Sequence, residues 1–217
     1  MRYVLMILLC AGWVGGVRGG DVRVLALGDS LTAGYGLEPD FAFPAVLQEL
    51  AREAGYAVMV RNAGLSGETS AGGVRRLEWV LRQRVDVLLL SLGANDALRG
   101  IDPATTRENL RTMILRAREL QPGILIILGG MRAPPNLGSA YAEAFDAIFP
   151  DLAEELDTGL IPFLLEGVAG DPALNQADGI HPTAEGQQRI ARLVWRELER
   201  VLAARGEEAQ ESSEPRS

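Results

Sequence analysis

Residues 24–32 read VLALGDSLT. An apolar run of Val, Leu and Ala stops at Gly28, and Ser30 follows two residues later. This order predicts a buried strand that delivers a serine hydroxyl to the rim of a sheet, where glycine permits a sharp turn. Ser30 could act there as a nucleophile, although small polar residues also form ordinary turns. A base, an orienting acid and oxyanion donors elsewhere in the chain would favour the nucleophile.

Apolar runs alternate with amphipathic segments from residue 22 onward, which indicates βαβ units. Strands are expected at 22–27, 57–60, 85–92, 124–128 and 160–164. Helices are expected at 43–54, 73–83, 105–120, 139–156 and 183–202. Because crossovers are right-handed, this order predicts an α/β fold, namely a three-layer α/β/α sandwich around a five-stranded parallel sheet with flavodoxin-like winding.

The composition is that of one globular domain. The chain has 217 residues, of which 47% are hydrophobic and 23% charged, so it is long enough for a sizeable core. It carries 29 acidic and 21 basic residues, all of the latter arginine, for a formal net charge of −8. This acidic balance without a basic run argues against nucleic-acid-binding proteins, which need a positive footprint.

Residues 1–20 are expected to form a secretory signal peptide. Arg2 precedes an apolar block that is shorter than the ~20 residues of a membrane span, and small residues follow it. This predicts a periplasmic or secreted protein with no stable membrane span after cleavage; an uncleaved anchor is the alternative. The folded domain is expected at 21–203, and the polar, acidic residues 204–217 are expected to be a disordered tail. Nothing in the sequence predicts the oligomeric state.

Polar residues gather at the expected carboxyl ends of the strands, where open parallel sheets bind ligands. His181 is the only histidine, and Asp178 lies three residues before it, close enough for the carboxylate to fold back onto the imidazole. Such a histidine can take the proton of Ser30, whose hydroxyl is otherwise a weak nucleophile. The Asn95 amide and the N–H groups of Gly64 and Ser30 are candidate oxyanion donors. Alternatively, Asn95 only caps a turn and Gly64 only permits a positive φ.

Metal-dependent chemistry is poorly supported. The chain has one histidine, and its single cysteine, Cys10, lies in the segment expected to be removed. That single cysteine also excludes an intramolecular disulfide. Metal-free acyl transfer without a cofactor fits better. Asp29 is interpreted as a structural residue that bonds backbone in the turn before Ser30.

Four short blocks of the sequence resemble those of the SGNH hydrolases, also called GDSL esterases and lipases. In family order they are GDSL at 28–31, NAG at 62–64, GAND at 93–96 and DGIHP at 178–182. The resemblance implies the SGNH hydrolase fold and ester hydrolysis through a covalent acyl-serine intermediate, without a cofactor. It places the catalytic triad at Ser30, Asp178 and His181, and the oxyanion hole at Ser30, Gly64 and Asn95.

Further stretches, at 27–36, 95–100 and 141–145, are similar to a bacterial periplasmic branch of that family with thioesterase, protease and lysophospholipase activities. This branch implies hydrolysis of acyl thioesters, aryl esters and lysophospholipids, and a mobile loop beginning near Ala97 that closes over an acyl chain. Ala97 is therefore an expected substrate-binding residue, with Leu31, Leu65 and Leu98. Leu31, Leu65 and Leu98 lie near the expected site and favour a fatty acyl group.

Two alternatives remain open. The same blocks occur in carbohydrate O-deacetylases, in which a polar cleft would replace an acyl groove. A non-catalytic binding module on the same sandwich would have no need of Asp178 and His181 together with Ser30. The expected partners are small-molecule esters, thioesters or lysophospholipids, and no nucleic acid.

Overall fold

A single parallel sheet forms the centre of the protein. The computed structural model describes residues 22–211, with side chains described up to residue 205. The strand order is β2-β1-β3-β4-β5, and every neighbouring pair is parallel. The strands are β1 (Val22–Gly28), β2 (Val58–Gly64), β3 (Val87–Ser91), β4 (Leu125–Gly129) and β5 (Gly159–Ile161).

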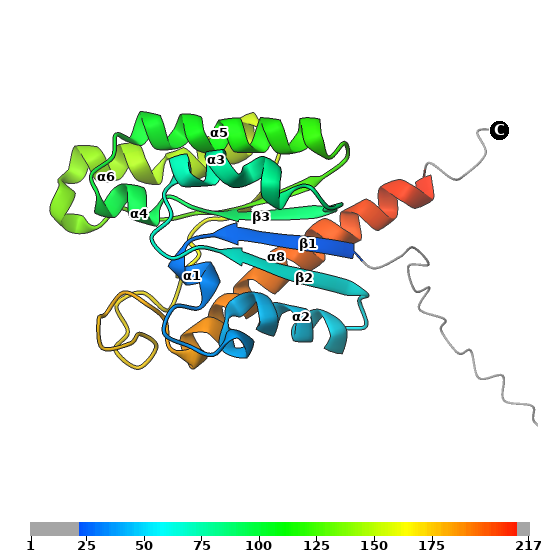
Figure 1. Ribbon diagram of the computed structural model, residues 1–217, viewed down its shortest axis with the longest axis horizontal. Coiled ribbons are helices and arrows are strands. Elements are labelled where there is room, and N and C mark those ends of the chain that lie inside the picture. The colour runs from blue at the N-terminus through cyan, green and yellow to red at the C-terminus, as the bar shows by residue number, and fades with distance from the viewer. Residues whose placement is uncertain (1–21, 212–217) are drawn as a thin grey trace, which may run out of the picture.

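Helices cover both faces of this sheet (Figure 1), which confirms the predicted three-layer α/β/α sandwich. One face carries α2 (Phe43–Glu53) and α8 (Ala184–Glu211), which pack against each other. The other carries α3 (Ser70–Val80), α5 (Pro103–Leu120), α6 (Ser139–Asp146) and α7 (Ile148–Glu155). A short helix follows each of two strands, α1 (Ser30–Ala33) after β1 and α4 (Ala94–Leu98) after β3. The single 3₁₀ turns η1 (Pro39–Phe41) and η2 (Pro135–Leu137) lie in loops.

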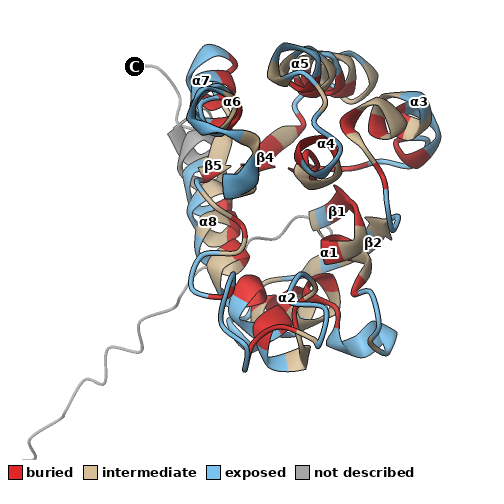
Figure 2. Ribbon diagram, turned by 90° about the vertical axis from the view of Figure 1, so that its left-hand side faces the viewer, coloured by how far each residue is buried: buried red, intermediate tan, exposed pale blue. Residues whose placement is uncertain are grey.

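The core lies between the sheet and the two helical layers, and Figure 2 shows buried residues on the helix faces that point inward. All five residues of β3 are buried, as expected for a central strand covered on both faces. The register aligns Gly28 at the end of β1 with Gly64 of β2 and Ser91 of β3. The carboxyl ends of these three strands therefore meet at one edge of the sheet.

Several elements differ from the predicted boundaries. β2 continues through Arg61 and Asn62 to Gly64, because an edge strand tolerates polar side chains that a central strand would bury. The predicted helix 139–156 is divided into α6 and α7, and Pro150 lies in the first turn of α7, where its missing N–H cannot continue an α-helical ladder.

The predicted domain limits can be compared with the structure only at the C-terminal end. α8 extends to Glu211 rather than ending near residue 202, so part of the predicted tail is helical, in keeping with the high helix propensity of Ala, Arg and Glu there. The predicted signal peptide and residues 212–217 lie outside the described residues. Within residues 22–211, no helix has both the length and the apolar character needed to cross a membrane.

Candidate active site

Ser30 is the first residue of α1, which starts directly beyond the end of β1. Asp29 caps this helix, and its Oδ1 accepts the Leu31 N–H at 3.0 Å. A Cβ at Gly28 would lie 2.1 Å from Thr32 Oγ1 and 2.8 Å from the Ser91 carbonyl oxygen, so glycine is required for the strand to enter the helix this closely. The turn leaves Ser30 partly exposed at the rim of the sheet.

His181 lies in the loop between β5 and α8, where Asp178 folds back onto it. Asp178 Oδ1 accepts the N–H groups of Ile180 and His181 at 2.9 and 3.0 Å, and Asp178 Oδ2 lies 2.7 Å from His181 Nδ1. These bonds, above all the one from the His181 N–H, hold the pKa of the Asp178 carboxyl well below its usual range. An ionised carboxylate at Nδ1 favours the tautomer in which Nε2 is free to accept a proton.

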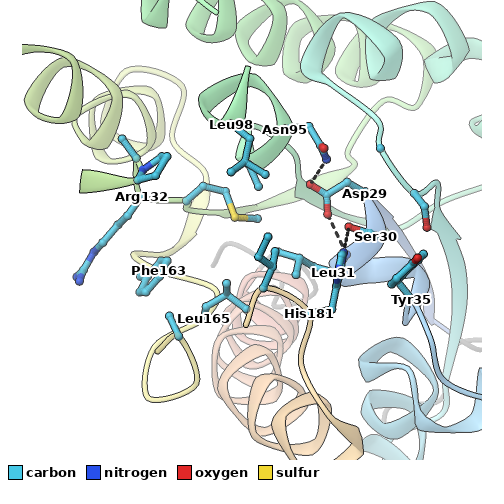
Figure 3. Close-up of a pocket in the computed structure, with 18 residues that line it drawn as sticks. Asp29, Ser30, Leu31, Tyr35, Asn95, Leu98, Arg132, Phe163, Leu165 and His181 are labelled. Atoms are coloured by element: carbon cyan, nitrogen blue, oxygen red, sulfur yellow. Dashed lines mark hydrogen bonds between the residues drawn. The ribbon is translucent and has the colours of Figure 1, made fainter. Parts of the chain in front are cut away.

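The fold brings His181 against Ser30, which is 151 positions away in the sequence. His181 Nε2 lies 3.0 Å from Ser30 Oγ (Figure 3). With the contact between His181 and Asp178, the three predicted triad residues form one hydrogen-bonded chain. Tyr35 also contacts the imidazole, with 4.4 Å between the two ring centroids. Gln176 Nε2 donates to the carbonyl oxygens of Tyr35 and Pro182 at 2.7 and 3.0 Å, which ties the loop after α1 to the histidine loop.

Asn95 lies in α4, and its side chain reaches the turn that carries Ser30. Asn95 Nδ2 donates to Asp29 Oδ2 at 3.2 Å. Asp29 is completely buried, and this burial raises the pKa of its carboxyl to about 6 despite the hydrogen bonds it accepts. Asp29 bonds the Leu31 backbone, as predicted. Its contact with Asn95 was not predicted.

Gly64 does not have the geometry of an oxyanion donor. Its N–H already donates to Asn62 Oδ1 at 2.9 Å, and Gly64 does not line the pocket beside Ser30. Glycine is needed there for another reason, because a Cβ would lie 2.2 Å from the Ala33 N atom. Gly67, three residues further on, does line the pocket, and among the hydrogen bonds of residues 22–211 none uses its N–H.

An apolar pocket of about 450 Å³ opens beside Ser30 and His181. Figure 3 places Phe163 and Leu165 on the side of this pocket away from Ser30. Its walls come from the segments that follow the carboxyl ends of all five strands, and the segment after β5 is the loop that carries His181. The apolar lining residues are Leu31, Ala94, Leu98, Met131, Ala133, Pro134, Phe163, Leu165, Ala169 and Ile180.

The predicted substrate-binding residues are only partly in this lining. Leu31 and Leu98 line the pocket, as expected. Ala97 does not, because α4 turns its side chain into the core, where it is 1% exposed. Leu65 also lies outside the lining and is 53% exposed. The sequence prediction missed the pocket wall away from Ser30, which includes Phe163 and Leu165 and has no recognisable motif. The only indication in the sequence is that the loops of this wall follow the carboxyl ends of β4 and β5, where ligands bind in open parallel sheets.

Comparison with known proteins identifies the family. Residues 26–189 match the GDSL-like lipase/acylhydrolase family. The chain belongs to this family. The GDSL-like relatives include the esterase TesA of Pseudomonas aeruginosa, which is 41% identical over 82% of this chain and 89% of its own. Thioesterase 1/protease 1/lysophospholipase L1 of Escherichia coli K12 is 40% identical over 82% of this chain and 84% of its own.

A solved GDSL-like structure gives the same fold. The psychrotrophic esterase EstA from a Pseudoalteromonas species, in a form inhibited by monoethylphosphonate, superposes with a TM-score of 0.79. The sequences are 31% identical, and the match covers 84% of this chain and all of EstA. Together with the matched family, this confirms the predicted resemblance and the SGNH hydrolase fold.

Proposed function

We propose that the protein hydrolyses carboxylic esters and thioesters through a covalent acyl-Ser30 intermediate. The proposal rests on the hydrogen-bonded chain Ser30–His181–Asp178. Ser30 Oγ lies 3.0 Å from His181 Nε2, and His181 Nδ1 lies 2.7 Å from Asp178 Oδ2. His181 takes the Oγ proton as Oγ bonds to the acyl carbon, and then gives it to the leaving alcohol or thiol. Water, deprotonated by His181, attacks the acyl carbon and frees Ser30 Oγ, which regains its proton.

The oxyanion of each tetrahedral intermediate is held by donors around Ser30. The Ser30 N–H is one, because the first N–H groups of a helix have no partner within that helix. The Asn95 amide is the second, since Asp29 occupies only one of its two hydrogens. We assign the third to the Gly67 N–H in place of Gly64. Each such donor typically lowers the barrier by about 3 kcal/mol.

The substrate that this site fits best carries a fatty acyl group. The pocket beside Ser30 is lined mainly by aliphatic and aromatic side chains, which would exclude water from a methylene chain. A carbohydrate O-deacetylase would need a cleft with several polar side chains for the sugar hydroxyls. The relative named thioesterase 1/protease 1/lysophospholipase L1 supports activity on thioesters and lysophospholipids.

The cellular location narrows the substrate further. A protein exported by the predicted signal peptide would act in the periplasm or outside the cell, where acyl-CoA is not normally supplied. A formal net charge of −8 also disfavours long-range attraction of so anionic a ligand. Lysophospholipids and simple carboxylic esters are therefore the proposed natural substrates, with thioesterase activity secondary. Fractionation of cells that express the full chain tests the location, and a cytosolic pool with a higher kcat/KM on acyl-CoA would overturn this order.

A substrate series tests the proposed reaction. The protein would be assayed on p-nitrophenyl esters from acetyl to dodecanoyl, on lysophosphatidylcholine and on acetylated xylan oligosaccharides. Ser30→Ala and His181→Ala should lose several orders of magnitude in kcat, and Ser30→Ala should also lose fluorophosphonate labelling. Ser139→Ala at the start of α6 is the matched control and should behave as the wild type. Activity confined to acetyl groups would instead establish the O-deacetylase alternative.

A further inference from the structure

Asp29 is a buried carboxylate beside the proposed nucleophile, yet it takes no part in the chain Ser30–His181–Asp178. Its Oδ1 accepts the Leu31 N–H at 3.0 Å and its Oδ2 accepts Asn95 Nδ2 at 3.2 Å (Figure 3). Among the hydrogen bonds of the described residues, none joins Asp29 to the Ser30 hydroxyl. Asp29 is therefore not placed to act as the base for Ser30.

Capping of α1 does not by itself account for an aspartate here. Serine and asparagine cap a helix about as well and carry no charge. A buried charge is costly, and burial raises the pKa of Asp29 to about 6. Asp102, by contrast, caps α5 with the same kind of contact, to the Ala104 N–H at 2.8 Å, at an exposed position. What distinguishes Asp29 is the second oxygen, which faces Asn95.

We propose that Asp29 is a positioning residue that orients the Asn95 amide for the oxyanion hole. The ionised carboxylate only accepts hydrogen bonds, so the amide must present Nδ2 to it and not Oδ1. This keeps one Nδ2–H on Asp29 and leaves the other for the oxyanion. If the amide turned over, its oxygen would replace that donor and repel the developing charge. The inference rests on the proposed function, because it assigns Asn95 a donor role in the same site.

Asp29→Ser separates this role from helix capping. Serine preserves a capping oxygen for α1, but its side chain is too short to keep the contact with Asn95. We expect kcat on p-nitrophenyl butyrate to fall at least about tenfold, and at most by the factor lost in Asn95→Ala, on the order of 100 to 1,000, with KM little changed. Asp102→Ser, which alters the equivalent cap of α5, is the matched control and should retain wild-type kcat and KM.

A double-mutant cycle supplies the decisive readout. If Asp29 acts only through Asn95, the double variant Asp29→Ser, Asn95→Ala should be no slower than Asn95→Ala alone. Losses that multiply would overturn the proposal, because they would show that Asp29 works independently of Asn95. Asp29→Asn provides a second route if Asp29→Ser does not fold: the shape is kept, but an NH₂ group would face the Asn95 amide. Its kcat should fall as far as that of Asn95→Ala, and wild-type kcat would contradict the proposal.

The catalytic variants keep the two proposals distinguishable. Ser30→Ala and His181→Ala that stay active would refute the proposed reaction itself. If both are inactive while Asp29→Ser and Asp29→Asn keep kcat within about threefold of the wild type, only the positioning role of Asp29 fails.

Discussion

Replacing Asp29 by asparagine should change the stability of the protein in a way that depends on pH. The Asp29 carboxyl is completely buried, and burial raises its pKa from the usual 3.8 to about 6. Between these two pH values the folded state holds a proton that the unfolded state has lost. The wild type therefore loses stability as pH rises through this window, whereas Asp29→Asn has no carboxyl to ionise at this position.

The size of the effect follows from the shift in pKa. A rise from 3.8 to about 6 corresponds to about 3 kcal/mol of unfolding free energy, which is fully lost once the pH exceeds the folded-state pKa. The free energy of unfolding of Asp29→Asn minus that of the wild type should thus become more positive by about 2 kcal/mol between pH 4 and pH 7.5, since part of the effect is already lost at pH 4. Loss of the contact with Asn95 also destabilises the variant, but this loss does not make the difference in unfolding free energy more positive as pH rises.

Urea denaturation of both proteins at several pH values measures this difference. His181 is the titratable group whose charge also acts on Asp29, so the series should be repeated in the His181→Ala background to remove its contribution. A difference in unfolding free energy that stays constant across the pH range would refute the reasoning. It would mean that the Asp29 carboxyl titrates alike in the folded and unfolded chain.

Three other variants test separate parts of the structure. Asp178→Asn should lower kcat by on the order of 1,000-fold or more while KM changes little, because the neutral amide no longer fixes the imidazole tautomer; steady-state kinetics would show it, and a loss below tenfold would contradict the assignment. Ala133→Phe should shorten the pocket, so kcat/KM on dodecanoyl esters should fall by about fourfold for each methylene displaced while acetyl esters are hydrolysed as before; an equal loss at all chain lengths would show that residue 133 does not limit the acyl site. Gly28→Ala places a Cβ 2.1 Å from Thr32 Oγ1 and should reduce the free energy of unfolding by about 1–3 kcal/mol, measured in urea, whereas an unchanged value would mean that α1 adapts.

Much of the fold could be predicted from hydrophobic patterning. The apolar runs that became β1 and β3 are nearly free of polar residues, so their position and burial followed directly. The end of β2 could not be placed, since edge strands alternate with polar residues and resemble loops in sequence. That misplaced boundary also bears on Gly64, which was expected in a loop. In the structure Gly64 pairs within the sheet and its N–H donates to Asn62 Oδ1, whereas Gly67 lies beyond the strand and lines the pocket.

The triad was predictable because the chain has a single histidine. With a single histidine and a nearby aspartate, few arrangements were available, and the structure joins His181 to both Asp178 and Ser30 by hydrogen bonds. The pocket walls were harder to predict. Phe163 and Leu165 lie in an irregular loop whose path depends on long-range packing rather than on local sequence preference.

Trapping the acyl-enzyme tests the central claim most directly. The protein would be mixed with p-nitrophenyl dodecanoate, quenched in acid within milliseconds, digested and analysed by mass spectrometry. A burst of p-nitrophenol with a dodecanoyl increment on the peptide that contains Ser30, absent from Ser30→Ala and present in Ser139→Ala, is the predicted result. An increment on another residue, or turnover in Ser30→Ala at the wild-type rate, would contradict it.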